Sequence, residues 1–378
     1  MTKPMLWVFA ALLALSANAA ASQFPTGHNP RSEIWLDFSD LDFVLKSSVL
    51  DMGPSTHKRA HRLQQSNGSR LVMGNHKATR REGNRVAFHL FEDVHHQVLG
   101  TIRDDLLSLP DQINLIDLSR NSQLAYWLNL HNAIVLAELA DAYPFTNVQP
   151  MFDRTQPSAF INRPDHMVAG RKVSLADIQD HVLSNWRDPL VIYGFYMGAV
   201  GTPNIRQEAY YGERVYDQLR DNARNFVNSV RGTQIWNGSE LRVASYYLRM
   251  AVKFPNFERD VIKHIRQYAR PKFATRLVAV NHISPDINDW NIADLYNGHL
   301  HIAGGSKPIT VSDFQSVIPR NFNLPPQVMQ VLEARRYNYQ NFEGQVTIEE
   351  VSAGSSDPEA KDTVDEDKDD DPDEPVIL

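Results

Sequence analysis

One short stretch, "LAYWLNLHNAIVL" at residues 124–136, constrains the fold more than any other part of the chain. Apolar side chains cover nearly every side of a helix built from it, namely Leu124, Trp127, Leu128, Ile134, Val135 and Leu136. A helix without a polar face is enclosed by protein on all sides. The stretch is too short and too polar to span a membrane, which needs about 20 mainly apolar residues. Other segments must therefore pack around this helix.

Three polar residues interrupt the stretch: Asn129, His131 and Asn132. The two asparagines are three residues apart and share a helix face, whereas His131 points about 100° away from Asn132. A buried amide without partners costs roughly 1 to 3 kcal/mol. We interpret both asparagines as scaffold residues that bond the backbone of a loop crossing the helix, and His131 as a histidine of the core or its rim. The alternative is that these three residues, with Thr202, face a ligand.

The first 21 residues have the pattern of an export signal. A basic start at Lys3 precedes an apolar run from Met5 to Ala17, and small residues follow up to Ala21. We expect cleavage after Ala19 or Ala21, and a periplasmic or secreted protein. No later stretch is apolar enough for a transmembrane segment, so none is expected in the mature chain.

The chain contains no cysteine. Disulfides, a thiolate nucleophile and cysteine-ligated zinc are therefore excluded.

Charge is unevenly distributed along the chain. Residues 357–378 carry eleven acidic residues against two lysines, a net charge of −9; the whole chain carries −7, so the remainder carries about +2. A run of like charges with so few apolar residues cannot bury enough surface to fold. We expect a disordered acidic tail at 346–378.

Residues 55–85 are rich in arginine and lysine, with Glu82 as the one acid. Such a segment could attract an anionic polymer. Nucleic acid is not expected as a partner, because an exported protein seldom meets it and the segment lacks the interleaved aromatics of a single-strand binder. We interpret this basic segment as a solvated loop.

The remaining pattern predicts many helices and few strands. Helical spacing occurs over 34–50, over 88–109 up to Pro110, and from Ser119 or Ser122 to before Pro144, and again over 174–183, 213–230, 245–254 and 257–269. Strands are predicted at 190–197, 275–283 and 298–304. Because helices and strands are segregated rather than alternating, we expect an α+β fold: a helix-rich single large domain around a small, mainly antiparallel sheet. The domain is placed at 25–300, with a C-terminal extension at 301–345 packed on it.

Four motifs in order resemble those of a family of proteins of unknown function, DUF family 547. They are "GNRVAFHLFE" at 83–92, "AYWLNLHNAIVL" at 125–136, "SLADIQDHVL" at 174–183 and "NDWNIADL" at 288–295. The similar region runs roughly from residue 35 to 296. The family has been linked to papain-like cysteine hydrolases, a kinship that implies a papain-like or transglutaminase-like core.

The chain departs from the family where thiol chemistry would be expected. Relatives carry a histidine, a Cys-Gly-Ala and a second cysteine before a proline, whereas "VIYGFYMGAVGTPNI" places Ile192, Met197 and Thr202 at these three positions. A thioether has no proton to lose and isoleucine cannot accept one. The resemblance therefore implies that the scaffold is kept without the nucleophile and base.

Two histidine groups are candidates for a metal site. His89, Glu92 and His96 have a spacing that fits one helix face, and His299 and His301 alternate on a predicted strand, where Asp294 could join them. A half-exposed polar face explains the first group equally well, and the second group fits a metal only if the acid joins it. No cofactor is expected.

Two functions of different classes remain. The first is a non-catalytic binding or interaction protein of the cell envelope, whose partner is an envelope protein or polymer. The second is a hydrolase of an envelope peptide or polysaccharide that uses histidine and carboxylates, or a metal. The absence of cysteine favours the first and makes the chain a candidate pseudoenzyme.

Overall fold

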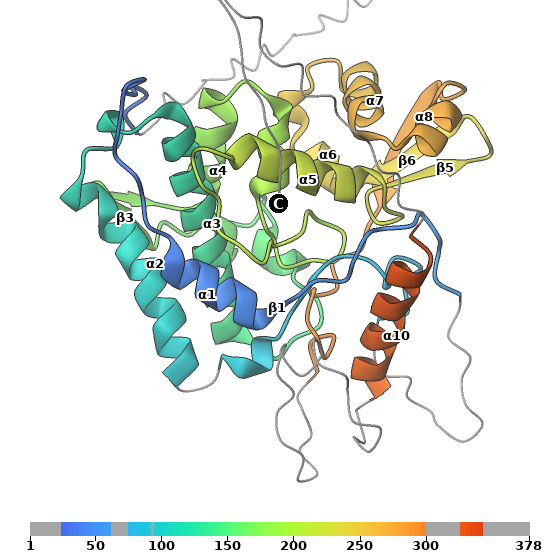
Figure 1. The fold of residues 1–378 in the computed structure, drawn as a ribbon, viewed down its shortest axis with the longest axis horizontal. Helices are drawn as coiled ribbons and strands as arrows, with labels where there is room; N and C mark the ends of the chain where they lie inside the picture. The colour runs from blue at the N-terminus through green and yellow to red at the C-terminus, as the bar shows by residue number, and fades with distance from the viewer. Residues whose placement is uncertain (1–23, 62–74, 92–93, 300–325, 343–378) are drawn as a thin grey trace, which may run out of the picture. The chain divides into compact units, whose positions relative to one another are not determined.

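A computed structural model describes residues 24–61, 75–91, 94–299 and 326–342, all within one compact unit, residues 1–342 (Figure 1). The predicted signal peptide, the acidic tail and the predicted strand beyond His299 lie outside the described residues. The helices of the described part are α1 (Ser39–Ser48), α2 (Val94–Gln112), α3 (Arg120–Ala142), α4 (Leu175–Asn185), α5 (Val215–Val227), α6 (Ser245–Arg249), α7 (Phe257–Tyr268), α8 (Pro271–Leu277) and α10 (Pro326–Gln340). Short 3-10 helices are η1 (Phe88–Leu90), η2 (Leu115–Asp117), η3 (Gln149–Phe152), η4 (Phe160–Asn162), η5 (Pro189–Gly194) and η6 (Ala251–Lys253).

Helix α3 lies at the centre, as its apolar pattern predicts. It begins after Ser119, whose hydroxyl accepts a hydrogen bond from the backbone N–H of Ser122, and it ends before Pro144. Nearly all of its residues from Gln123 to Ala140 are buried, and α2, α4 and α5 pack against it (Figure 1). Among the described residues, no helix is both long and apolar enough to cross a bilayer.

Helix α4 confirms the predicted start signal at Ser174. The Ser174 hydroxyl accepts from the Asp177 N–H, and the Asp177 carboxylate accepts from the Ser174 N–H, so the two residues form a capping box. The prediction for Pro110 was wrong, because α2 runs through this proline to Gln112. Pro110 lies near the end of the helix, and its missing N–H removes only one of the backbone hydrogen bonds of the helix.

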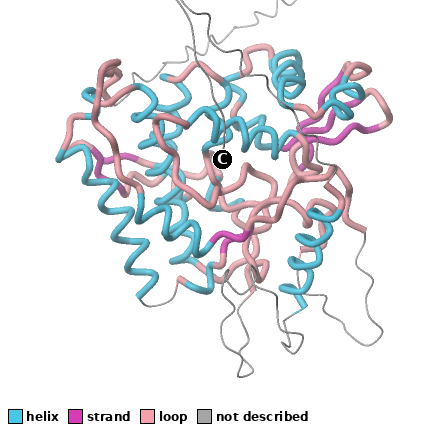
Figure 2. Tube along the Cα trace, in the orientation of Figure 1, coloured by secondary structure: helices cyan, strands magenta, loops and turns pink. Residues whose placement is uncertain are grey.

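Strands are few, as Figure 2 shows, and they form three separate small sheets rather than the one predicted. Strands β1 (Val49–Leu50) and β2 (Arg85–Val86) pair antiparallel, and so do β3 (His166–Val168) and β4 (Arg171–Val173). The third sheet has the order β5 (Thr233–Trp236), β6 (Glu240–Ala244) and β7 (His282–Ile287). The β5–β6 pair is antiparallel and the β6–β7 pair is parallel. The α+β class is confirmed.

The buried run at 190–197 is not the predicted strand. It forms η5, which Asp188 caps and Pro189 opens, and then an irregular buried segment. A short apolar run between turn signals has the same pattern in a strand and in a buried turn. Gly198 then adopts φ +71°, and a Cβ there would lie 2.3 Å from Leu139, so only glycine fits. The strand predicted at 275–283 was also misplaced, because α8 extends to Leu277 and β7 begins at His282.

Helix α10 covers a second, smaller hydrophobic core. Its Val328, Val331 and Ala334 pack there, and the other members are Leu50, Met52, Ala87, Leu295 and Tyr296. Three polar contacts fasten the helix to the segment after β1, beside which it lies in Figure 1. Asn338 donates to the Met52 carbonyl, Arg335 to the Asp51 carbonyl, and the Tyr339 hydroxyl to the Asp51 carboxylate.

The interpretation of residues 55–85 as a solvated loop was wrong for its described part after Asn75. Arg80, Glu82 and Arg85 are all buried. The Arg85 guanidinium donates to the carbonyls of Arg80, Glu82 and Gly83, so it folds the chain around itself. Glu82 accepts the backbone N–H of Arg231, which is buried as well. Composition suggests solvation here, but the guanidinium groups of Arg80 and Arg85 bond backbone carbonyls and the Glu82 carboxylate bonds a backbone N–H.

Candidate functional site

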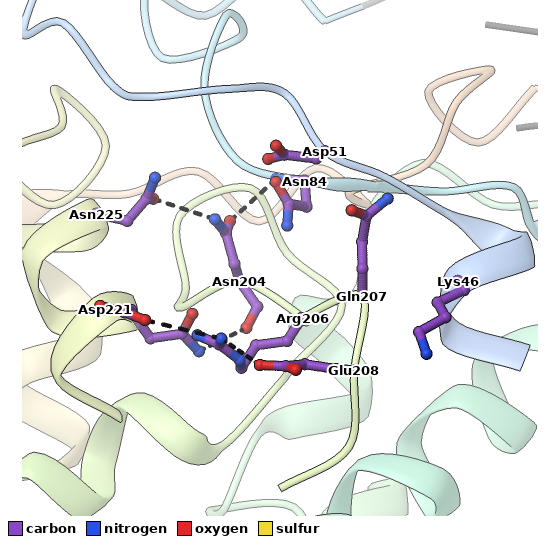
Figure 3. Close-up of a pocket in the computed structure, with 10 residues that line it drawn as sticks. Lys46, Asp51, Asn84, Asn204, Arg206, Gln207, Glu208, Asp221 and Asn225 are labelled. Carbon is purple, nitrogen blue, oxygen red and sulfur yellow. Dashed lines mark hydrogen bonds and ion pairs between the residues drawn. The ribbon is translucent and has the colours of Figure 1, made fainter. Parts of the chain in front are cut away.

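A polar cleft of about 450 Å³ lies where five segments meet (Figure 3). Its walls come from the end of α1, the turn after β1, the residue before β2, the loop 204–208 and the middle of α5. The lining residues are Lys46, Asp51, Asn84, Asn204, Arg206, Gln207, Glu208, Asp221, Asn222 and Asn225. In Figure 3 Lys46 stands on the opposite side of the cleft from Asp221 and Asn225. Half of these side chains are carboxamides, which can donate and accept hydrogen bonds at once.

Hydrogen bonds from the carboxamides to each other and to backbone hold one wall of the cleft in place. Asn204 accepts from the Asn84 N–H at 3.0 Å and donates to Asn225 Oδ1 at 3.1 Å, as the dashed lines in Figure 3 show. The Asn222 amide donates to the carbonyls of Tyr193 and Asn204. These bonds fix the loop after Pro203, which lacks regular secondary structure of its own, against α5.

A buried arginine supports this wall from behind. Arg231 donates from one terminal nitrogen to Asn225 Oδ1 at 2.8 Å and from the other to the carbonyls of Val200 and Thr202. Burial lowers the pKa of Arg231 to about 10, although the nearby Glu82 carboxylate opposes the shift. The guanidinium is therefore still charged at neutral pH, and its charge lies directly behind the carboxamides.

A network of charges forms the other wall, centred on Glu208. Arg206 and Arg214 contact its two carboxylate oxygens at 2.6 and 2.9 Å, and the Gln218 amide donates to it at 3.0 Å. Burial raises the pKa of Glu208, but the hydrogen bonds from Gln218 and Arg206 and the charges of both arginines outweigh it and leave the pKa below its ordinary value. Glu208 is therefore ionised at neutral pH and unsuited to be a general acid.

The side chains of the cleft can form hydrogen bonds with a polar ligand. Its ten lining side chains include no serine, threonine or histidine that could serve as a nucleophile or a neutral base. Carboxamides together with charges of both signs can bond hydroxyl, amide and carbonyl groups of a polar ligand. Sequence reasoning singled out none of these ten residues for the site. A signal was nonetheless available, since Asn84 lies in the "GNRVAF" motif and Asn204 follows the Gly-Thr-Pro loop.

The two asparagines of α3 bond loop backbone, as the scaffold interpretation predicts. Asn129 donates to the Tyr210 carbonyl and accepts the Tyr210 N–H, both at 2.8 Å. Asn132 donates to the Gly194 carbonyl and accepts the Tyr196 N–H, both at 3.0 Å. Each amide thus replaces a backbone partner in a buried irregular segment. Asn129 holds the chain two residues beyond Glu208, so it positions the cleft loop from behind.

His131 has hydrogen-bond partners within the core. Its Nδ1 lies 3.0 Å from Asn132 Oδ1 and its Nε2 lies 2.9 Å from the Gln179 amide nitrogen. The first contact requires a proton on Nδ1, so the second makes Nε2 the acceptor. Burial lowers the pKa of His131 to about 4, which keeps the ring neutral. Neither His131 nor the asparagines line the cleft.

The positions of the family's thiol chemistry are buried away from the cleft. Ile192, Met197 and Thr202 are each at most 1% exposed. The Thr202 hydroxyl donates to the Ala199 carbonyl at 2.9 Å, which closes the turn before Pro203. The segment pairs with the chain near Ile292: the Val200 N–H donates to the Asn291 carbonyl, and the Ala293 N–H donates to the Gly198 carbonyl. Met197 therefore packs in the core, and these three residues are not brought to an open site.

The candidate metal ligands are only partly described. His89 is buried in η1 with its ring edge-on to Tyr296, and His299 is half-buried after Gly298. Glu92, His301 and the side chain of His96 lie outside the described residues. The Asp294 carboxylate accepts the backbone N–H groups of three residues, Phe88, Tyr296 and Gly298. Within the described part of the chain, no three histidine or acidic side chains are close enough to hold a metal.

Comparison with known proteins confirms the resemblance on which the interpretation rests. Residues 115–227 match the model of the family described as "Protein of unknown function, DUF547". The match covers α3, α4, the η5 segment and α5, whereas the motifs at 83–92 and 288–295 fall outside it. No curated protein and no solved structure matches the chain significantly.

Proposed function

We propose that this chain, of which residues 115–227 match the model of the DUF547 family, is an exported, non-catalytic binding protein of the cell envelope. The carboxamide-lined cleft is its ligand site. One observation carries the proposal: the positions linked to thiol chemistry hold buried Met197, Ile192 and Thr202, while the open cleft, which none of them lines, offers hydrogen-bonding groups.

The chemistry of the cleft points to a ligand with alternating donors and acceptors. Peptide bonds and acetamido sugars, the constituents of envelope polymers, present N–H, carbonyl and hydroxyl groups that carboxamides bond equally well. Charges at both ends would fix the direction of such a strand, with Lys46 on one side and Asp221 on the other. A papain-like core remains a prediction from the family resemblance.

The first test measures binding of soluble peptidoglycan fragments by calorimetry. We expect the double variant Lys46→Ala/Asp221→Ala to weaken binding at least about tenfold, because each change removes a charged hydrogen-bonding group worth roughly 1.5 kcal/mol or more. Both side chains are largely exposed, at 66% and 61%, so folding should be unaffected. Asp217→Ala on the same helix is the control, since Asp217 is 68% exposed and does not line the cleft. If wild type, double variant and control bind the fragments with equal affinity, the cleft is not the binding site.

The second test addresses the alternative of a hydrolase. We expect the purified chain and its Thr202→Ala variant to leave peptidoglycan, peptide and ester substrates uncleaved, because the Thr202 hydroxyl is buried and bonds a carbonyl rather than a base. Mass spectrometry of the products is the measurement. Turnover that vanishes in the variant would overturn the non-catalytic interpretation. Turnover that survives in the variant but stops with a chelator would favour metal chemistry.

A further inference from the structure

A second cavity, of about 290 Å³, lies between α10 and the turn at Arg80 and Arg81. Its lining residues are Arg80, Arg81, Gln330, Glu333, Ala334, Arg336, Tyr337 and Gln340. Three arginines face one glutamate, so the lining carries a net charge of +2. Within the described part of the chain, neither Arg81 nor Arg336 forms an ion pair.

Arg81 is held in place by contacts with α10. The Arg81 guanidinium lies over the Tyr337 ring, with its central carbon 4.2 Å from the ring centroid, and Lys58 approaches the same ring at 5.7 Å. Asn338 donates to the Arg81 carbonyl at 2.8 Å, which fixes the backbone of the turn to α10. Ring stacking limits the directions in which the guanidinium fork can point.

Arg80 also lines the cavity and adds a positive charge to it. It is only 7% exposed, and its terminal nitrogens donate to the carbonyls of His61 and Lys77. Burial lowers the pKa of Arg80, and the neighbouring charge of Arg81 lowers it further. Two like charges at close quarters are an unfavourable arrangement, which an anion between them and Arg336 would relieve.

From this arrangement we propose that the cavity is a binding site for a phosphate group, distinct from the polar cleft and independent of its function. A phosphate monoester carries a charge of roughly −1.5 to −2 at pH 7, which balances the cavity, whereas a carboxylate supplies only half of it. Arginine forks bond phosphate oxygens in pairs. Gln330 and Gln340 supply further hydrogen-bonding groups. The phosphate is either free inorganic phosphate or an ester on a larger envelope molecule.

The test localises the site by arginine modification. The full chain is treated with phenylglyoxal with and without inorganic phosphate, at an ionic strength held constant with sodium chloride, and labelled peptides are quantified by mass spectrometry. We expect phosphate to slow labelling of Arg81 and Arg336 at least about threefold. When phosphate occupies two-thirds of the sites, only one third remains free to react. Arg276, an exposed arginine on α8, should label at an unchanged rate. Equal slowing of Arg276, or no slowing of Arg81 and Arg336, would overturn the proposal.

Variants separate recognition of phosphate from simple charge. Arg81→Gln should raise the phosphate dissociation constant about tenfold by calorimetry, and Arg81→Lys should give an intermediate value because lysine keeps the charge but lacks the fork. Arg336→Gln, at an exposed position, repeats the charge loss without disturbing the turn, and Arg276→Gln is the control. Glycerol phosphate binding as tightly as phosphate would identify an ester as the ligand, and tighter binding of inorganic phosphate would identify the free ion. Preference for glucuronate over both would contradict a phosphate site.

Discussion

Arg231→Met should lower the free energy of unfolding by about 3 to 5 kcal/mol, because several buried oxygens lose a charged hydrogen-bond donor at once. Arg231 is 1% exposed, and its guanidinium bonds the Val200 and Thr202 carbonyls and Asn225 Oδ1. Methionine keeps most of the volume but leaves all three oxygens without this donor. The Glu82 carboxylate would also lose its neighbouring positive charge. The difference in free energy of unfolding between variant and wild type is measured by denaturant titration, with circular dichroism as the probe of unfolding.

A double-variant cycle separates the charge from the hydrogen bonds. Glu82→Gln/Arg231→Met should recover part of the loss, because the glutamine carries no charge that needs compensation. A double variant that is less stable than Arg231→Met would contradict a role for the charge pair. Arg276→Met, at an exposed position, should leave stability nearly unchanged and serves as the control.

The same pair predicts a pH dependence. Burial raises the pKa of Glu82 from 4.5 to about 7, and the charge of Arg231 offsets only part of the shift. A folded-state pKa above the unfolded value means that the folded chain binds the proton more tightly. This contribution to stability is present below about pH 4.5 and is lost as the pH rises to about 7. Wild type should therefore lose stability relative to Glu82→Gln across this window, by roughly 3 kcal/mol at most.

The comparison with Glu82→Gln is needed because buried histidines act in the opposite direction. Burial lowers the pKa of His131, His181 and His264 to about 4. The contribution of these histidines to stability is present above pH 6.5, their pKa in the unfolded chain, and it is lost as the pH falls toward 4. This histidine contribution is the same in wild type and in Glu82→Gln, so it cancels when the stabilities of the two proteins are subtracted. A difference that stays flat from pH 4.5 to 7 would show that Glu82 titrates normally in the folded chain.

Asn132→Ala should destabilise the fold by about 3 kcal/mol, since it leaves a buried N–H and a buried carbonyl without partners at a cost of roughly 1 to 3 kcal/mol each. The two groups belong to Tyr196 and Gly194, in the irregular segment that has replaced the predicted strand. Because the segment is not part of a helix or sheet, no regular backbone hydrogen bond can replace the bonds that these two groups lose. The Tm should fall by several degrees in calorimetry.

Two further variants make the Asn132 result specific. Asn132→Asp keeps the acceptor for Tyr196 but loses the donor to Gly194, and it buries a carboxyl group, so it should also destabilise. Asn281→Ala, at an exposed position, should change stability little. Full stability of Asn132→Ala, combined with weaker binding of an envelope ligand, would instead support the ligand-facing alternative.

Helix α3 and its capped start were predictable because their causes are local. A helix surrounded by protein must be apolar all round, and Ser119 and Ser174 cap α3 and α4 within three residues of the chain. The use of Asn129 and Asn132 as backbone partners followed from the cost of burying an amide. The identity of the partners, Tyr210 for one and Gly194 and Tyr196 for the other, could not be predicted. They are 62 to 81 residues away in the chain.

The cleft could not be predicted for the same reason, although its residues are ordinary in the sequence. Asn84 and Asn204 are separated by 120 residues and meet only because β2 and the loop after Pro203 lie side by side. The basic segment shows the converse, since composition suggested a solvated loop although Arg80 and Arg85 are buried. Local periodicity, capping and the lack of cysteine were determined by the sequence alone, because each depends on neighbouring residues or on which residue types are present. The cleft, the burial of Arg231 near Glu82 and the cavity beside α10 were decided by the tertiary structure, because solvation and charge depend on what packs against a residue from far along the chain.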